Sequence, residues 1–321
     1  METQTTKDFT KWKVVIIGAG VMGVPLTQHF ATHGCSTVLC SRTISKLDEA
    51  LRQIQGNLKA MKSANLLPGA VSTEEIMGHI ETSDDLESAL KNANIVFECV
   101  PEEASIKQEI FYKMDKYAPE DAFLCSDTSA LNIYELVSVS HPERLLITHF
   151  FNPPNVMPLV EVVKGPDTSE KVVDRVKEFL EFVEKKPIIM EKCIPGFIFN
   201  RLLTALEREA LYIVELEAAT FQDIDTVITT TFGPRFTFEG IFRLLDHVGI
   251  DTEAAVVGDL LKELCDDKKP SSILLKKSKE GEHGLKKRKG FYDYEGVDLD
   301  DLRNKRTINI LNTLEHMKCL K

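Results

Sequence analysis

The chain has 321 residues, 43% of them hydrophobic and 28% charged, which is the balance of a folded protein and excludes a disordered or fibrous chain. This length favours two domains over one. Lys and Arg total 39 against 50 Asp and Glu, and the resulting net charge of -11 argues against a general nucleic-acid binder. Seven cysteines without a C-x-x-C pair predict reduced thiols, and His29 and His33 lack an accompanying carboxylate pattern. We therefore expect neither a disulfide framework nor a metal site.

The two ends of the sequence lack the residue patterns of common sorting signals. Residues Met1–Trp12 contain no apolar core of a signal peptide, and no run of 18 apolar residues occurs along the chain. The last three residues, 319–321, place Cys319 third from the end, which is not a prenylation box. We expect no membrane contact and a cytoplasmic location.

From Val14 to about Met190, short β-branched runs alternate with helical stretches. This alternation predicts an α/β fold with a doubly wound, mostly parallel sheet covered by helices. The predicted strands are residues 14–17, 37–40, 95–97, 123–125 and 145–147. The predicted helices are residues 21–32, 44–64, 106–117 and 172–183. Gly34 fits the position just past the first helix, and Ser105 fits an N-cap.

After Pro195 and Gly196 the apolar periodicity becomes helical only. We predict helices and no strand in this part, at residues 197–219, 222–231, 239–248, 252–265 and 299–317. The sequence thus predicts two domains, residues 1–194 and an all-α domain at 195–321. The basic stretch Lys286–Lys289 fits a solvated loop better than a contact with a phosphorylated ligand.

A glycine motif at residues 18–23 directly follows the first predicted strand and opens the first predicted helix, which is the context that G-x-G-x-x-G requires. Gly18 would allow the tight turn, Gly20 the approach of a pyrophosphate, and Gly23 close packing of helix on sheet. The motif predicts a Rossmann-type dinucleotide-binding domain. Its predicted cofactor contacts are Gly18, Gly20, Val21, Met22 and Gly23.

The end of the second predicted strand bears on which dinucleotide is bound. Ser41 and Arg42 stand where an NAD site carries Asp or Glu for the ribose 2′-hydroxyl. The missing carboxylate removes a repulsion against a 2′-phosphate, to which both side chains can donate. We predict that NADP(H) is preferred, and NAD(H) is the alternative if Arg42 is an ordinary surface residue.

Polar residues follow the later strands, on the side of the sheet where doubly wound folds bind ligands. His149 and Asn152 follow the fifth predicted strand, and Ser129 follows the fourth. Glu161 lies twelve residues beyond His149, and Asn200 enters the first long helix of the second domain. Singly, these residues fit caps, packing amides or solvated strand ends. As a set they predict a reaction site.

The ordered motifs resemble the 3-hydroxyacyl-CoA dehydrogenase family, including its lambda-crystallin or L-gulonate 3-dehydrogenase branch, over nearly the whole chain. The matching segments are residues 18–23, 98–102 with Lys107, 127–129, 149–153, 159–163 and 195–201. The resemblance implies that His149 is the general acid/base and that Glu161 orients it. It also implies that Ser129 and Asn200 hydrogen-bond the substrate oxygen. Glu102, Lys107 and Asn152 would lie near the nicotinamide end of the cofactor.

These residue types suit the oxidation of a secondary alcohol. Imidazole has an unperturbed pKa near 6.5, so His149 can accept or return a proton near neutral pH. Donors from Ser129 and Asn200 would stabilise the negative charge that gathers on the carbonyl oxygen during reduction. The family also implies a homodimer formed through the C-terminal domain. The broad apolar faces of its predicted helices, including Leu202 and Leu206, agree with that.

The sequence resembles two branches of the family that act on different substrates. Residues 149–152, 244–249 and 290–292 look like the branch that acts on 3-hydroxyacyl-CoA thioesters, which we favour. Residues 99–102, 152–158 and 233–236 look closer to the branch for free hydroxy acids. Arg235 could bind a carboxylate in the second case or lie on the surface. A crystallin-like protein without catalysis is a third possibility. The 3-hydroxyisobutyrate type lacks the residue 149–153 motif and uses a lysine.

Overall fold

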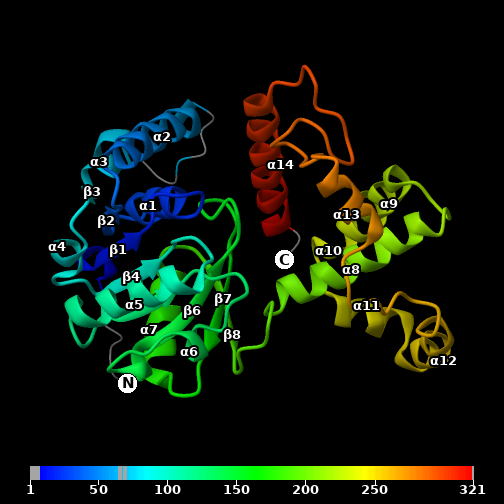
Figure 1. Cartoon of the computed structure of the whole chain (residues 1–321), viewed down its shortest axis with the longest axis horizontal. Coiled ribbons are helices and arrows are strands. Elements are labelled where there is room, and N and C mark those ends of the chain that lie inside the picture. The colour runs from blue at the N-terminus through cyan, green and yellow to red at the C-terminus, as the bar shows by residue number, and fades with distance from the viewer. Residues whose placement is uncertain (1–7, 64–66, 68–70, 320–321) are drawn as a thin grey trace. The chain divides into compact units, whose positions relative to one another are not determined.

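The computed structural model describes residues 8–63, 67 and 71–319 and divides the chain into two units, Met1–Phe199 and Asn200–Lys321. Within the described residues, the first unit is built on one eight-stranded sheet with the order β3-β2-β1-β4-β5-β6-β7-β8 (Figure 1). The strands are β1 (Lys13–Ile17), β2 (Ser36–Cys40), β3 (Ile80–Ser83), β4 (Ile95–Glu98), β5 (Phe123–Ser126), β6 (Leu145–Phe150), β7 (Leu159–Lys164) and β8 (Lys186–Met190). The strands from β3 to β6 are parallel, β7 is antiparallel to β6, and β8 is parallel to β7.

Helices cover both faces of this sheet because successive strand residues point to opposite sides. Val14 and Ile16 of β1 belong to one apolar cluster, whereas Val15 and Ile17 belong to the other. The first cluster is completed by α1 (Gly23–Thr32), α2 (Ile44–Ser63), α3 (Thr73–Gly78) and α7 (Glu170–Phe182). The second is completed by α4 (Leu86–Leu90), α5 (Ala104–Tyr117) and α6 (Ile133–Leu136). The predicted fold class, a doubly wound and mostly parallel sheet, is confirmed.

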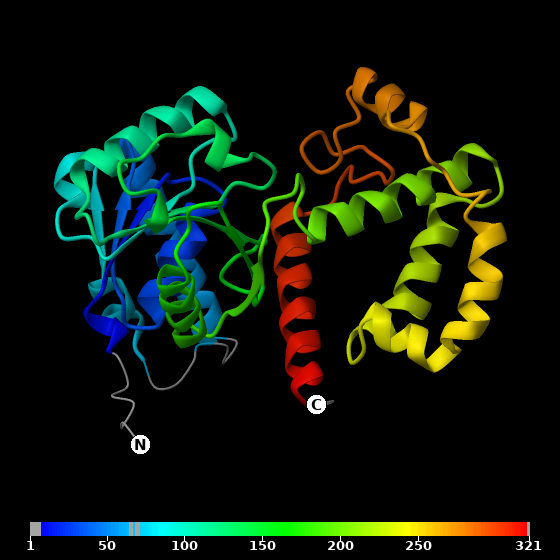
Figure 2. The same ribbon diagram turned by 90° about the horizontal axis from the view of Figure 1, so that it is seen from below.

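The second unit is helical throughout its described part, apart from isolated bridges that join Gly284 to Lys289 and Lys289 to Asp293 (Figure 2). Its elements are α8 (Phe199–Glu215), α9 (Phe221–Val227), η3 (Ile228–Phe232), α10 (Gly233–Phe236), α11 (Ile241–Val248), α12 (Ile250–Leu260), α13 (Ser272–Lys279) and α14 (Leu299–Cys319). The expectation of an all-α part is therefore confirmed. The sequence prediction lacked α13, and its exact domain boundary at 194/195 stays a prediction.

All five predicted strands and four predicted helices of the first unit are present, but strands β3, β7 and β8 and the short helices α3, α4 and α6 were not predicted, and one cap is misplaced. Gly34 follows the C-cap of α1 with a left-handed φ of 78°, as predicted. The prediction of Ser105 as an N-cap is wrong. Helix α5 begins one residue before it, and its N-cap is Glu103, whose carbonyl accepts the Lys107 N–H at 3.0 Å. Ala64, the predicted end of α2, lies outside the described residues.

The expectations about sorting signals and membrane contact concern residues at the ends of the chain as well as its helices. Residues 1–7 and 320–321 lie outside the described residues. Among the helices that the structure describes, none has both the length and the apolar character needed to cross a bilayer.

The contact between the glycine turn and the start of α1 leads to a stability prediction. A Cβ on Gly23 would lie 1.8 Å from the Gly18 carbonyl oxygen, which is a backbone atom. We expect Gly23→Ala to lower the free energy of unfolding by about 1–3 kcal/mol, because the turn or the helix must shift. Gly56→Ala is the matched control, since its Cβ meets nothing within 4 Å and Ala favours a helix by up to about 1 kcal/mol. Urea unfolding measures both, and equal effects would contradict the packing argument.

Candidate active site

The glycine turn lies where the strand order reverses, since β1 pairs with β2 on one side and β4 on the other. Open α/β sheets bind ligands at this point, beyond the carboxyl ends of the strands. Gly18 has a φ of 121°, and a Cβ on it would lie 2.5 Å from the Cys99 carbonyl oxygen at the end of β4. A Cβ on Gly20, in contrast, would meet nothing within 4 Å. The turn therefore packs closely on its protein side and leaves Gly20 open for a ligand, which fits a dinucleotide pyrophosphate.

The remaining predicted cofactor residues of this region are placed as follows. Val21 is exposed, and Met22 is the N-cap of α1 and packs partly against the first apolar cluster. Ser41 follows β2, and its backbone N–H donates to the Ser83 carbonyl at 3.1 Å. Arg42 is exposed. The structure brings Ser41 and Arg42 to the carboxyl end of β2, next to the glycine turn, whose Gly18 N–H donates to the Cys40 carbonyl at 2.8 Å.

His149 and Glu161 face each other across two paired strands. They lie in register in the antiparallel β6–β7 ladder, and directly opposite residues of such a pair have neighbouring side chains. The distance from His149 Nδ1 to Glu161 Oε2 is 2.8 Å. His149 is 6% exposed and Glu161 is fully buried, so the pair is shielded from water. An ionised carboxylate can only accept, so Nδ1 carries a proton and Nε2 remains as the basic nitrogen.

The second oxygen of Glu161 is held by the start of α8. Its Oε1 accepts the backbone N–H groups of Ile198 at 3.0 Å and Phe199 at 2.8 Å. The first N–H groups of a helix have no partner within the helix, and they favour a negative charge. The turn before them has left-handed φ angles at Gly196 (77°) and Phe197 (50°). The segment from Pro195 therefore delivers two donors to a carboxylate that is otherwise buried among strands.

Aromatic rings enclose the imidazole of His149. The Phe151 ring centre lies 4.6 Å from it, and the buried Phe197 ring centre lies 5.4 Å from it. Phe151 also packs edge-on against Phe199 at 4.7 Å. These contacts support one orientation of the His149 imidazole. A group that exchanges a proton with a bound substrate needs such support.

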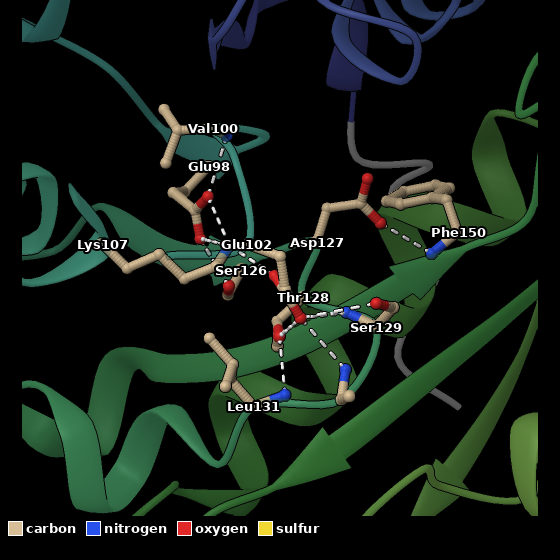
Figure 3. Close-up of polar contacts among 11 residues, drawn as sticks. Glu98, Val100, Glu102, Lys107, Ser126, Asp127, Thr128, Ser129, Leu131 and Phe150 are labelled. Carbon is tan, nitrogen blue, oxygen red and sulfur yellow. Dashed lines mark hydrogen bonds and ion pairs between the residues drawn. The ribbon is translucent and has the colours of Figure 1, made fainter. Parts of the chain in front are cut away.

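A second polar cluster lies at the ends of β4 and β5 (Figure 3). The Lys107 ammonium is buried and contacts Glu98 at 2.7 and 2.9 Å and Glu102 at 3.1 Å, so its three protons are all engaged. Burial opposes the charged form of Lys107, but the two carboxylates outweigh it and raise the lysine pKa. Ser126 and the Val100 N–H donate to Glu98 at 2.6 and 2.9 Å.

Glu102 connects this cluster to the turn after β5 that carries Ser129. Its Oε1 accepts the Thr128 hydroxyl at 2.5 Å and the N–H groups of Ser129 and Ala130 at 3.0 and 3.1 Å (Figure 3). Burial raises the pKa of Glu102, but the Thr128 hydroxyl and Lys107 together lower it below its usual value. Ser129, Glu102 and Lys107 are thus brought together by direct contacts.

The structure places the last two predicted residues just beyond β6 and at the start of α8. Asn152 is exposed and lies just beyond β6, three residues after His149. Asn200 is the first residue of the second unit and the second residue of α8. The contacts of both with a ligand stay predictions. Among the described residues, no group of three or more His, Cys, Asp or Glu side chains is arranged to hold a metal ion.

Three residues of this region carried no functional prediction. Glu98 is buried in the lysine cluster, and Asp127 accepts the Phe150 N–H at 2.9 Å. Lys185 is 5% exposed, and its Nζ donates to the Pro154 and Met157 carbonyls at 2.6 and 2.9 Å, beside the loop after β6. Burial lowers the pKa of Lys185 to about 7. The motif at residues 98–102 contained a signal for Glu98, whereas nothing in the sequence marked Lys185 as buried.

Comparison with known proteins agrees with this geometry. Residues 13–193 match the family model "3-hydroxyacyl-CoA dehydrogenase, NAD binding domain", and residues 196–294 match "3-hydroxyacyl-CoA dehydrogenase, C-terminal domain". The chain belongs to the 3-hydroxyacyl-CoA dehydrogenase family. The resemblance predicted from the ordered motifs is therefore confirmed, and a nicotinamide dinucleotide is the cofactor class of this dehydrogenase family.

Relatives that resemble this chain are named for different substrates. The human mitochondrial hydroxyacyl-coenzyme A dehydrogenase is 34% identical over 88% of this chain and 90% of its own. The 5-formyl-3-hydroxy-2-methylpyridine 4-carboxylate 5-dehydrogenase of Mesorhizobium japonicum is 30% identical, with the same shares covered. A crystal structure of such a 5-dehydrogenase, described as an NAD+ dependent dismutase, has a TM-score of 0.86 at 26% identity and covers 96% of this chain and 99% of its own.

Proposed function

We propose that this protein interconverts a short-chain 3-hydroxyacyl-CoA, such as 3-hydroxybutyryl-CoA, and its 3-ketoacyl-CoA, with His149 as the general acid/base. The observation that carries the proposal is the 2.8 Å contact between His149 Nδ1 and a fully buried Glu161. This pair leaves Nε2 as a base and supports the imidazolium that forms when it takes a proton. The family membership of both parts of the chain supports the choice of reaction.

The roles of the chain's own groups follow from this assignment. When bound, the nicotinamide accepts or delivers the hydride. Gly18, Gly20 and the start of α1 would hold the pyrophosphate, and Glu102 and Asn152 would lie near the nicotinamide end. Lys107, whose protons are engaged, acts through Glu102. His149 takes the hydroxyl proton at Nε2, and Ser129 and Asn200 donate to the substrate oxygen as it gains charge.

The pair is tested by removing each partner. His149→Gln or Glu161→Gln should lower kcat by about 10²–10⁴-fold, because each removes the proton acceptor or the group that orients it. Cofactor affinity should change little, since neither side chain belongs to the glycine turn. Steady-state kinetics and cofactor titration give both numbers. His141→Gln is the control, because His141 is exposed and pairs with Glu143 on the surface. A near-normal kcat in either site variant would contradict the role proposed for the substituted residue.

The preference for NADP(H) over NAD(H) is also a proposal. It is supported by Ser41 and Arg42, which put a donor and a cation where a carboxylate would repel a 2′-phosphate. We expect kcat/KM to be higher with NADP(H), and Ser41→Asp to shift the ratio toward NAD(H) by restoring the repulsion. Absorbance assays with each cofactor check this. A clearly higher kcat/KM with NAD(H) in the unaltered protein would contradict the proposed preference for NADP(H).

The alternative to an acyl-CoA substrate is a free hydroxy acid. A free hydroxy acid is favoured by the Mesorhizobium japonicum relative, whose name specifies a carboxylate substrate. It is also favoured by Arg235 of α10, whose exposed guanidinium donates to the Thr231 carbonyl at 2.9 Å. We expect turnover of acetoacetyl-CoA to exceed that of L-gulonate and 3-hydroxybutyrate. Activity confined to free acids would reverse the choice, and cofactor binding without any turnover would favour a crystallin-like protein.

We further propose a homodimer formed through the second unit. Among its described residues only Glu239 and Cys265 are buried, whereas Leu202, Phe242 and Ile250 are 60%, 79% and 68% exposed. A helical domain hides such faces in a core or against another subunit, and a symmetric pair is the common solution. Sedimentation should give about twice the mass of one 36.1 kDa chain.

A further inference from the structure

Asp127 connects the turn that carries Ser129 to strand β6, which carries His149. The backbone ladder between β5 and β6 ends with Ser126 opposite Ile147. One residue later, the Asp127 carboxyl oxygen Oδ1 accepts the Phe150 N–H at 2.9 Å (Figure 3). Phe150 directly follows His149 in β6. The Asp127 side chain therefore continues the pairing of the two strands to the position of the imidazole, where backbone atoms no longer do so.

The segment that begins at Asp127 is also held from the other side. The Asp127 N–H donates to the Glu98 carbonyl at 2.9 Å, and the Glu102 carboxylate accepts the N–H groups of Ser129 and Ala130. Residues 127–130 thus form a short turn that is fixed to β4, to α5 through Glu102 and Lys107, and to β6 through the Asp127 side chain.

The groups around Asp127 are mostly acidic. Cys99, Glu98 and Glu102 face it from the end of β4 and the turn that follows, and Lys107 faces it from α5. Burial raises the pKa of Asp127 well above its usual value, and the hydrogen bond from the Phe150 N–H opposes it. The Glu98 and Glu102 carboxylates add smaller raising effects, and Lys107 adds a smaller lowering one. Burial, followed by Asp127 and Glu98, raises the pKa of the Cys99 thiol as well. The raised pKa favours the neutral form of Asp127.

We propose that Asp127 is a positioning residue that fixes the Ser129 turn relative to His149 through its hydrogen bond to Phe150. The inference rests on the proposed function, since it assigns work to Asp127 through the groups that would handle the substrate oxygen and proton. A neutral carboxyl group suits this task, because a second negative charge beside Glu98 would push the turn away from the lysine cluster. Displacements of about 1 Å at such groups can cost about 10²-fold in rate.

The first test compares two substitutions at this position. Asp127→Ala removes the acceptor and should lower kcat at least about tenfold with a small change in the KM for the cofactor. Asp127→Asn keeps an acceptor for the Phe150 N–H and should restore most of kcat. Asp121→Asn, at an exposed site before the same strand, is the control. Equal kcat in Asp127→Ala and the unaltered protein would overturn the positioning role, whereas absence of turnover in the unaltered protein overturns the proposed function instead.

The second test uses pH, and its unfolding measurement needs no turnover. The folded-state pKa of Asp127 is raised, so its contribution to stability is complete below the unfolded value and is lost as pH rises toward the folded value. The free energy of unfolding of Asp127→Asn relative to the unaltered protein should therefore increase from pH 5 to pH 8. A stability difference that is independent of pH would overturn the assignment of a raised pKa to Asp127.

Discussion

The antiparallel pairing of β6 with β7 is the constraint on which the candidate site depends. It places His149 opposite Glu161 in one register. Because strand side chains alternate between faces, a slip by one residue would turn one of the two side chains to the other side of the sheet. The neighbouring pairs, Thr148 with Val162 and Phe150 with Val160, are buried apolar or nearly apolar contacts that resist such a slip. Ordinary strand packing therefore fixes the geometry of the His149–Glu161 pair.

Buried carboxylates are costly unless each is paired or hydrogen-bonded, and this site uses a different solution for each. Glu161 is satisfied by an imidazole and two helix N–H groups. Glu98 shares the Lys107 ammonium with Glu102. Burial raises the pKa of Asp127 well above its usual value, which favours its neutral form. The region thus holds several acids close together while limiting the net charge that it buries.

The sequence predicted the elements with strong local signals and missed those set by distant partners. The glycine turn and the strands 14–17 and 37–40 combine periodicity with turn residues, so they were found nearly to the residue. Strand β8 was missed because it begins with Lys186 and is flanked by charge, and β6 runs past the predicted end because His149 continues the pairing with β7. The burial of Glu98 and Lys185 depends on partners far along the chain, which periodicity does not reveal.

Glu161 accepts hydrogen bonds from the N–H groups at the start of α8, so the charge on this carboxylate and the order of the first helical turn depend on each other. If the first turn of α8 frays, the carboxylate loses two donors and its charge is less well supported. A protonated imidazole favours the ionised carboxylate, and by reciprocity an ionised carboxylate favours the intact turn. On the proposed role of His149, proton transfer at its imidazole would therefore change the stability of the first turn of α8.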